Sequence, residues 1–403
     1  MTNISHRQDR FPAAFYMLIV IQFLQSLSFY MIAPIFTKYL TGQGIPLAMA
    51  GTLSGLMSYT CLVTRPFSGR LADWADRRKI LTGSSVLFGV SIMLYACVSS
   101  QAGIVVLRVM TGVAFCLSGT TLFAFAGHFI PETRMGEGVG YVGLGHIIAS
   151  AVGPLLGSSL AEAFGIRISF ILAGAASLIC VLLLLTPPFS APVAAAKQPE
   201  RDARGSSRPA RNRWIAPALI PIACLGSLFS YTSSTVSNFL VLYADARGIV
   251  NATLYFTVLA AALFILRPFL GKAHDRFGIS SVLIPGLILS MAGVLMMMRA
   301  TGIVHLLVAA VLLAFGQGGA QPAVQASCLK SLSADQRGVA TSTYYIFNDL
   351  MQGIAPSLGG AAIQYSGYNL AFSLCIVFFA VGLIYYLCLA HYQKKRARQH
   401  TSA

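Results

Sequence analysis

Long apolar stretches alternate with short polar gaps along the whole chain. A membrane-crossing helix needs about 20 mainly apolar residues, and twelve stretches approach or exceed this length. They cover residues 12–37, 46–68, 80–100, 103–127, 137–161, 166–186, 214–243, 251–270, 279–299, 303–328, 338–364 and 368–391. The pattern therefore predicts an all-α integral membrane protein with twelve transmembrane helices.

The longest interruption of the pattern divides the chain into two halves. Residues 187–213 are rich in Pro, Ala, Arg and Ser, a composition typical of a flexible linker. We therefore expect an N-terminal six-helix bundle over residues 1–186 and a cytoplasmic linker over residues 187–213. A second bundle is expected over residues 214–391, followed by a basic cytoplasmic tail over residues 392–403.

The composition supports this interpretation. Hydrophobic residues make up 56% of the chain and charged residues only 10%, whereas soluble domains carry about 25% charged residues. A soluble enzyme is thereby excluded. The net charge of +16 arises from 28 Lys and Arg against 12 Asp and Glu, but the basic residues lie in the gaps rather than on one folded face, which argues against nucleic-acid binding.

The distribution of positive charge predicts the orientation in the membrane. All but five Lys and Arg residues fall on the side that carries both termini; the other five are Lys38, Arg108, Arg167, Arg247 and Arg299. Cytoplasmic loops of membrane proteins carry an excess of Lys and Arg. We expect a multi-pass protein of the inner cell membrane with both termini in the cytoplasm.

An internal repeat relates the two halves. Arg65-Pro66-Phe67-x-Gly69-Arg70 recurs 202 residues later as Arg267-Pro268-Phe269-x-Gly271-Lys272, and the same offset relates Pro154 to Pro356 and Gly157 to Gly359. Two homologous halves of this kind predict a substrate cavity between them, near the middle of the bilayer.

The loop from Gly69 to Lys79 (GRLADWADRRK) resembles the G-x-L-A-D-R-x-G-R-R signature of the major facilitator superfamily, and Gly271 to Gly278 echoes it. Trp74 and Asp76 stand where the signature has Arg and Gly. The resemblance covers essentially the whole chain and implies two pseudo-symmetric six-helix halves. It also implies a conformational latch that stabilises the outward-open state, formed by Gly69, Asp73, Arg77 and Arg78 and in the second half by Gly271, Asp275 and Arg276. A solvated, positively charged loop is the alternative.

Two further motifs are similar to elements of the superfamily. Arg108-Val109-Met110-Thr111-Gly112 resembles its R-x-x-Q-G element and implies that Arg108 takes part in proton coupling, unless the side chain extends to the membrane surface. Span 5 carries Gly140, Gly153, Pro154 and Gly157, similar to a motif of exporters in the drug:proton antiporter branch. Small residues and Pro at this spacing could equally serve helix packing and bending alone.

Only one carboxylate lies in the middle of a span. The other Asp and Glu residues fall in gaps or at span ends, whereas Asp349 lies well inside span 11. An ionised carboxylate at that depth is costly, which suits a group that binds and releases a proton. The 202-residue offset relates its neighbour Asn348 to His146 in span 5, and histidine also titrates near neutral pH. We expect Asp349 to be the main proton carrier, with His146 as its partner or as a substrate ligand; hydrogen bonding between helices is the alternative for both.

Polar side chains within other spans are candidates for a substrate cavity, although such residues can also hold helices together. Span 1 contains no acidic residue, so the predicted substrates are polar and uncharged or zwitterionic rather than cationic. The predicted cavity residues are Gln22, Gln25, Tyr30, Tyr231, Asn238, Gln317, Gln321, Gln325, Tyr344, Tyr345 and Asn348.

These features predict a proton-coupled antiporter that exports small organic molecules by alternating access. A narrow-specificity exporter of a metallophore or sugar, a proton symporter for uptake, and a non-transporting receptor or scaffold are the alternatives. No GxSxG or HExxH motif indicates an enzyme, and the eight cysteines form no CxxC, so no metal or cofactor is expected. The expected partners are a small-molecule substrate, protons and the lipid bilayer, with no nucleic acid, and the chain is expected to act as a monomer.

Overall fold

The computed structural model describes residues 11–131, 134–186, 189, 215–331 and 337–401, although the side chains of some helical residues, Asp73 and 392–401 among them, are not described. Every regular element in these ranges is a helix, which confirms the all-α prediction. The first half comprises α1 (Ala13–Gly42), α2 (Leu47–Trp74), α3 (Arg77–Leu94), α4 (Gln101–His128), α5 (Met135–Phe164) and α6 (Ile166–Leu184). The second half comprises η4 (Pro217–Leu219), α7 (Ile220–Ala246), α8 (Leu254–Phe277), α9 (Ser280–Met298), α10 (Ile303–Phe315), η5 (Gly316–Ala320), α11 (Gln321–Lys330), α12 (Arg337–Ser366) and α13 (Tyr368–Thr401).

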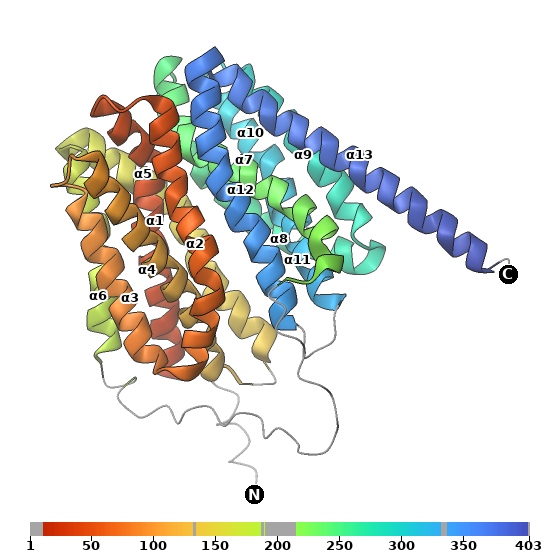
Figure 1. Cartoon of the computed structure of the whole chain (residues 1–403), viewed down its shortest axis with the longest axis horizontal. Coiled ribbons are helices and arrows are strands. Elements are labelled where there is room, and N and C mark those ends of the chain that lie inside the picture. Colours follow the sequence, from red (N-terminus) through yellow and green to blue (C-terminus); the bar gives the residue numbers. More distant parts are fainter. Residues whose placement is uncertain (1–10, 132–133, 187–188, 190–214, 332–336, 402–403) are drawn as a thin grey trace, which may run out of the picture. The chain divides into compact units, whose positions relative to one another are not determined.

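The chain forms two compact units, and each has its own hydrophobic core. Unit 1 consists of Met1–Gly44 and Leu56–Trp214, and unit 2 of Ile45–Gly55 and Ile215–Ala403. In unit 1, α1 packs along α5, and α3 packs against α4 and α6; in unit 2, α7 packs along α12, and α9 packs against α10 and α13. Figure 1 shows these helices and the long α13 that ends at the C-terminus. The paired helices of one unit are the repeat mates of those in the other, so the two units share one packing scheme.

Most helices are suited to a membrane. Ten helical segments of the described chain are long and apolar enough to cross one. The two that fall short are α3 and α12, and α12 carries the polar pair Asn348–Asp349 in its middle. Large apolar side chains also remain exposed, as on α13, where Val377, Val381 and Ile384 share one face. Such a face suits contact with lipid.

Several helix boundaries differ from the predicted ones for identifiable local reasons. The α3 helix begins at Arg77, before the predicted start at 80, because the Asp76 carboxylate accepts a hydrogen bond of 2.9 Å from the Arg78 backbone N–H and caps the helix. Ser100 caps α4 in the same way. The tail predicted at 392–403 continues α13 as far as Thr401, and the linker predicted at 187–213 lies almost wholly outside the described residues.

The span predicted over residues 303–328 corresponds to one apolar helical segment, Ile303–Lys330, but this segment is not α-helical throughout. Gly316–Ala320 form a π-helical turn, η5, which separates α10 from α11. Four closely spaced small residues and Pro322, which has no backbone N–H to donate, weaken regular α-helical pairing here. Turns of this kind are frequent at functional sites.

Candidate functional site

A polar network in unit 1 surrounds His146 of α5. The Ser26 hydroxyl lies 3.2 Å from His146 Nδ1, and the Tyr30 hydroxyl lies 3.0 Å from Nε2. Gln22 donates a hydrogen bond of 3.0 Å to Ser26. Gln22, Ser26 and Tyr30 follow one another at intervals of four residues, which places them on one face of α1. Each ring nitrogen therefore faces a hydroxyl that can donate or accept, so the site accommodates the neutral or the protonated imidazole.

Glycines on α5 bring this helix close enough to α1 for the network to form. A Cβ at position 153 would lie 2.6 Å from the Tyr30 Cβ, and one at position 157 would overlap the Met31 carbonyl oxygen. Small residues permit such close approach between membrane helices. At position 140 nothing lies within 4 Å, so of these three motif glycines, two lie at the α1–α5 contact and Gly140 does not.

A second polar network in unit 2 surrounds Asn348 of α12, which is buried. The Ser230 hydroxyl of α7 and the Gln321 amide of α11 both donate to Asn348 Oδ1, the latter over 3.2 Å. Gln321 also donates to Ser230 over 2.9 Å, and Asn348 donates to the Tyr344 carbonyl over 2.8 Å. One asparagine thus connects three helices. The repeat offset relates Asn348 to His146, so each network lies at the equivalent contact of its unit, α1–α5 or α7–α12.

Other predicted cavity residues extend or border the second network. Gln325 donates to the Tyr345 hydroxyl over 3.3 Å, and the Tyr344 hydroxyl reaches the Gln321 carbonyl at 3.4 Å. Gln317 lies within η5. The π turn therefore lies between Gln317 and the two glutamines of α11 and interrupts the α-helical register that would otherwise relate the three.

Three predicted cavity residues lie elsewhere in their units. Tyr231 is fully buried in the core of unit 2, with its ring centroid 4.6 Å from that of Phe378 on α13. Gln25 donates to Ser85 of α3 over 3.4 Å, and Asn238 donates to the Ser234 carbonyl one turn earlier on α7. Sequence reasoning missed Ser230, although the repeat relates it to Ser28, one of the polar residues of span 1.

Arg108 and Asp349 are the only buried charged side chains among the described residues, and each is 7% exposed. Asp349 is also the only described carboxylate away from helix ends, since Asp76, Glu137, Glu162, Asp245 and Asp275 all lie within one turn of a terminus or at a cap. Among the described residues, each unit therefore encloses one ionisable side chain of this kind, a basic one in unit 1 and an acidic one in unit 2.

Arg108 of α4 lies among aromatic and sulfur-containing side chains. Its guanidinium carbon lies 3.3 Å from the centroid of the Phe36 ring and 5.7 Å from that of Tyr95, and Nη1 lies 3.7 Å from the Met57 sulfur. Its Nε has no hydrogen-bond partner among the described residues. Cation–π contact compensates part of the desolvation of the charge. The side chain is thus enclosed in unit 1 rather than extended to the helix end.

Comparison with known proteins identifies the family. A family model for the Major Facilitator Superfamily matches residues 18–271 and 223–402. The chain belongs to the Major Facilitator Superfamily. It is thus a multi-pass membrane transporter of small molecules with the twelve-helix fold of that superfamily.

Relatives of this superfamily member extend over nearly its whole length. The multidrug resistance protein MdtG of Citrobacter koseri is 25% identical over 400 residues, which cover 94% of each chain. The uncharacterized MFS-type transporter YuxJ of Bacillus subtilis is 24% identical, with 89% of this chain and 94% of that protein covered. A crystal structure of a POT family transporter in complex with a thioalcohol-conjugated peptide has a TM-score of 0.78 at 14% identity, covering 95% of this chain and 96% of that one. That likeness shows the fold alone.

The superfamily signature loop joins α2 and α3 in unit 1. Asp73, the acidic residue of the predicted latch, has a side chain outside the described set, and nothing lies within 4 Å of a Cβ at Gly69. Arg77 donates to the Ala124 carbonyl over 3.3 Å. Arg78 donates to the Leu184 and Phe189 carbonyls over 2.8 and 2.9 Å.

The contacts of Arg78 give it a role that sequence reasoning missed. Leu184 is the last residue of α6, and the final carbonyls of a helix have no donor within the helix. The guanidinium supplies donors and places a positive charge at the negative end of the helix dipole. Arg78 therefore caps α6 in this structure.

The second copy of the signature makes a different contact. Asp275 lies 3.7 Å from the Lys330 ammonium at the end of α11, and both side chains are largely exposed. Arg276 lies over the Phe277 ring, at 5.2 Å from its centroid. Exposed ion pairs contribute little stability, so the Asp275–Lys330 pair can open readily.

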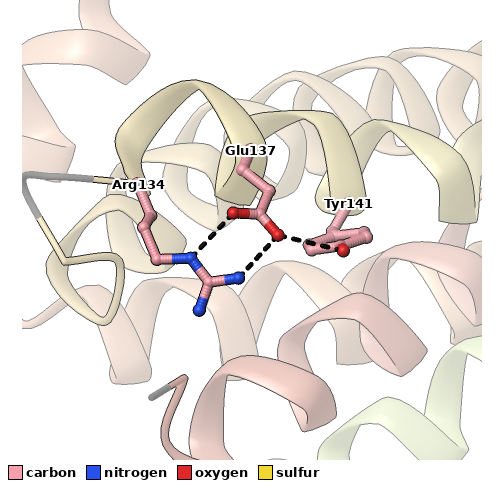
Figure 2. A network of polar contacts seen from close by, with 3 residues as sticks. All are labelled: Arg134, Glu137 and Tyr141. Carbon is pink, nitrogen blue, oxygen red and sulfur yellow. Dashed lines mark hydrogen bonds and ion pairs between the residues drawn. The ribbon is translucent and has the colours of Figure 1, made fainter. Parts of the chain in front are cut away.

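An ion pair at the start of α5 was also missed by sequence reasoning. Arg134 binds both carboxylate oxygens of Glu137, over 2.7 and 2.6 Å, and the Tyr141 hydroxyl donates to Glu137 over 3.1 Å. Figure 2 shows the three side chains on consecutive turns. The hydrogen bonds from Arg134 are the main cause that lowers the pKa of the Glu137 carboxyl. Arg134 also lies over the ring of Phe11, which precedes α1, at 4.4 Å, so the cluster connects the beginnings of α1 and α5.

Proposed function

We propose that this transporter is a proton-coupled antiporter that exports small polar organic molecules by alternating access. The observation that carries the proposal is the pair of networks at equivalent helix contacts, one around the titratable His146 and the other beside the buried Asp349. Membership of a transporter superfamily and relatives described as multidrug resistance proteins support export.

Asp349 is proposed as the proton carrier. It is buried in the middle of α12, next to Asn348. Burial of a carboxyl group favours its protonated form over its ionised form in general. Proton binding would therefore favour one conformation of the transporter and proton release the other, which is what coupling requires.

His146 is proposed as a second proton site or as a substrate ligand. Its ring is exposed, while Ser26 and Tyr30 fix its orientation through both nitrogens. A substrate that displaces one hydroxyl would meet an imidazole and the freed hydroxyl together. Because α1 contains no carboxylate, these groups suit a polar uncharged or zwitterionic substrate rather than a cation.

Arg108 is proposed as a third member of the coupling machinery. Its positive charge is enclosed, and its Nε has no hydrogen-bond partner in the part of the chain that the structure describes. The guanidinium can therefore respond to a negative charge that arrives or forms nearby. The latch between Asp73 and its neighbours, the cytoplasmic location of both termini in the inner membrane and the monomeric state remain part of the same proposal.

Transport measured in proteoliposomes with an internal pH-sensitive dye tests the proposal. A panel of cationic, neutral and zwitterionic compounds is added to wild-type protein, to Asp349→Asn and to His146→Ala. Glu162→Gln is the matched control, because it removes a carboxylate at the end of α5 rather than in the middle of a helix. We expect Asp349→Asn to bind substrate without moving protons, while Glu162→Gln behaves as wild type. Full coupling in both Asp349→Asn and His146→Ala would refute the assignment, and proton movement in the same direction as substrate would show symport.

A further inference from the structure

One face of α8 in unit 2 is exposed and changes from apolar to basic toward the end of the helix. Ile265 and Phe269 are 59% and 66% exposed, and Lys272 and Arg276, which follow them, are exposed as well. Spacings of three and four residues place the four side chains on one face of the helix. We call this face, formed by Ile265, Phe269, Lys272 and Arg276, the α8 stripe.

The opposite face of α8 makes the contacts within unit 2. Leu263 is buried there, and Arg267 and His274 line a cavity between α8 and η5 with α11. The π turn packs against the same side, since a Cβ at Gly319 would lie 2.8 Å from a methyl carbon of Leu270. The α8 stripe therefore points away from the core of its unit and takes no part in that cavity.

The place of the basic residues along α8 matches the thickness of a membrane. From its first residue, Leu254, the helix rises about 27 Å to Lys272 at about 1.5 Å per residue. The hydrocarbon core of a bilayer is about 30 Å thick, and α8 is long and apolar enough to cross it. The apolar half of the α8 stripe thus lies at the depth of the acyl chains, and its basic half lies at the depth of the lipid phosphates.

The two basic side chains of the α8 stripe are not offset by a described carboxylate. Lys272 and Arg276 lie one turn apart, where like charges repel. The neighbouring Asp275 lies 3.7 Å from Lys330 instead, so that pair is neutral by itself. Arg276 lies over the Phe277 ring at 5.2 Å, a contact that leaves the net charge unchanged. The end of the α8 stripe therefore carries two positive charges that an external anion would stabilise.

The repeat reproduces the apolar half of the α8 stripe but not the basic pair. On α2, Val63 and Phe67 occupy the positions 202 residues before the two apolar members, and they are 68% and 62% exposed. At the positions of the two basic members the first half has Arg70 and Trp74. Of these two related stripes, only the one in the second half carries two basic residues.

We propose that the α8 stripe binds an anionic phospholipid, with its acyl chains along Ile265 and Phe269 and its phosphate between Lys272 and Arg276. Arginine recognises phosphate with two parallel hydrogen bonds, and the lysine ammonium adds a second positive charge. A zwitterionic phospholipid would bring its own ammonium group beside these two cations, so the site favours a lipid with a net negative charge. Attraction of basic residues to the helix dipole would not require exposed apolar side chains in line with them.

Lipid binding to the full chain in dodecyl maltoside tests the proposal. The delipidated protein is titrated separately with phosphatidylglycerol and with phosphatidylethanolamine of the same acyl chains, and bound lipid is counted by native mass spectrometry. We expect phosphatidylglycerol to bind about tenfold more tightly or better, because two basic residues attract it. The site involves neither proton coupling nor substrate, so its test is independent of the proposed antiport.

Single substitutions then locate the site. Lys272→Gln and Arg276→Gln should each weaken phosphatidylglycerol binding about fivefold, whereas Lys272→Arg keeps the charge and should bind as wild type does. Arg299→Gln is the matched control, because Arg299 is exposed and follows the last residue of α9, at the opposite end of the next span. The control should change binding less than twofold. Gel filtration and thermal unfolding check that each variant is folded.

The outcomes support or overturn the site. A preference for phosphatidylglycerol that both glutamine variants reduce and Arg299→Gln leaves intact supports it. Equal binding of the two lipids, or an equal loss in Arg299→Gln, overturns it. If the basic pair served only the carbonyls at the end of α8, both glutamine variants would lower the Tm and leave lipid binding unchanged, and that result would overturn the proposal too.

Discussion

The close contact between α1 and α5 predicts that a single methyl group added at Gly157 destabilises the protein. A Cβ at Gly157 would overlap the Met31 carbonyl oxygen and lie 2.7 and 2.8 Å from the Met31 carbonyl carbon and Cα. All three atoms belong to the backbone, so no side-chain rotation can relieve the overlap. Ordinary contacts of a Cβ begin at 3.4 Å, and the overlap with the carbonyl oxygen is the most severe of the three. Gly157→Ala therefore forces α5 away from α1 by roughly 1 Å or more in a close-packed interior.

The expected magnitude follows from comparison with another glycine of the same helix. Overpacking typically costs about 1–3 kcal/mol, while replacing a helical glycine by alanine contributes about 1 kcal/mol of helix propensity. Gly140 has nothing within 4 Å, so Gly140→Ala gains the propensity without the overlap. The free energy of unfolding should therefore differ between the two variants by about 1–3 kcal/mol, with Gly157→Ala the less stable.

Thermal unfolding in detergent, followed by fluorescence, measures this difference directly. We expect the Tm of Gly157→Ala to fall relative to that of Gly140→Ala, and the Tm of Gly140→Ala to equal or exceed that of wild type. Substrate binding should also weaken in Gly157→Ala, because withdrawal of α5 stretches the hydrogen bonds of His146 to α1. Equal stability of the two alanine variants would show that the close approach at Gly157 is not part of the folded protein.

Three further predictions concern single polar contacts. Arg78→Ala should lower the free energy of unfolding by about 1–2 kcal/mol more than Arg77→Ala does, because it removes two hydrogen bonds from a charged donor. Thermal unfolding should therefore show a lower Tm for Arg78→Ala, and equal Tm values for the two variants would argue against the α6 cap. Tyr30→Phe should shift the pH profile of transport, because it removes the hydroxyl at His146 Nε2, whereas an unchanged profile would mean that this ring does not titrate in the cycle. Since the folded-state pKa of Glu137 is lowered, the stability it adds is present above its unfolded pKa of about 4.3 and is lost as the pH falls through the folded value. Glu137→Gln should therefore lower the Tm at pH 7 and leave it unchanged in strong acid; the same difference at both pH values would contradict this.

The membrane-spanning segments and the internal repeat can be predicted from the sequence, because both depend only on which residues follow one another along the chain. Apolar length sets which segments can cross a bilayer, and the constant offset between Arg65 and Arg267 reveals the duplication. The position of Asp349 in the middle of a predicted span can also be read from the sequence, since it requires only the boundaries of that span and the residue number. These features depend on the order of residues along single helices.

The surroundings of the candidate site residues, in contrast, are determined by contacts between helices. Sequence spacing placed Gln22 and Tyr30 on one face of α1, but only the packing of α5 against that face brought His146 between Ser26 and Tyr30. The polar character of Tyr231 within its span made it a candidate for the cavity, whereas the structure buries it against Phe378 of α13.

In the signature loop and in span 10, too, the sequence locates the residues and the tertiary structure determines their contacts. Sequence located Arg78 in a motif, and the structure showed that its guanidinium caps α6, more than a hundred residues later. The glycines and Pro322 of span 10 were visible in the sequence, but the π turn and the cavity beside it arise only where α8 packs on η5. Periodicity determines which residues share a face of one helix; which neighbour covers that face depends on the tertiary fold, because it is set by complementary shapes on segments far apart in the chain.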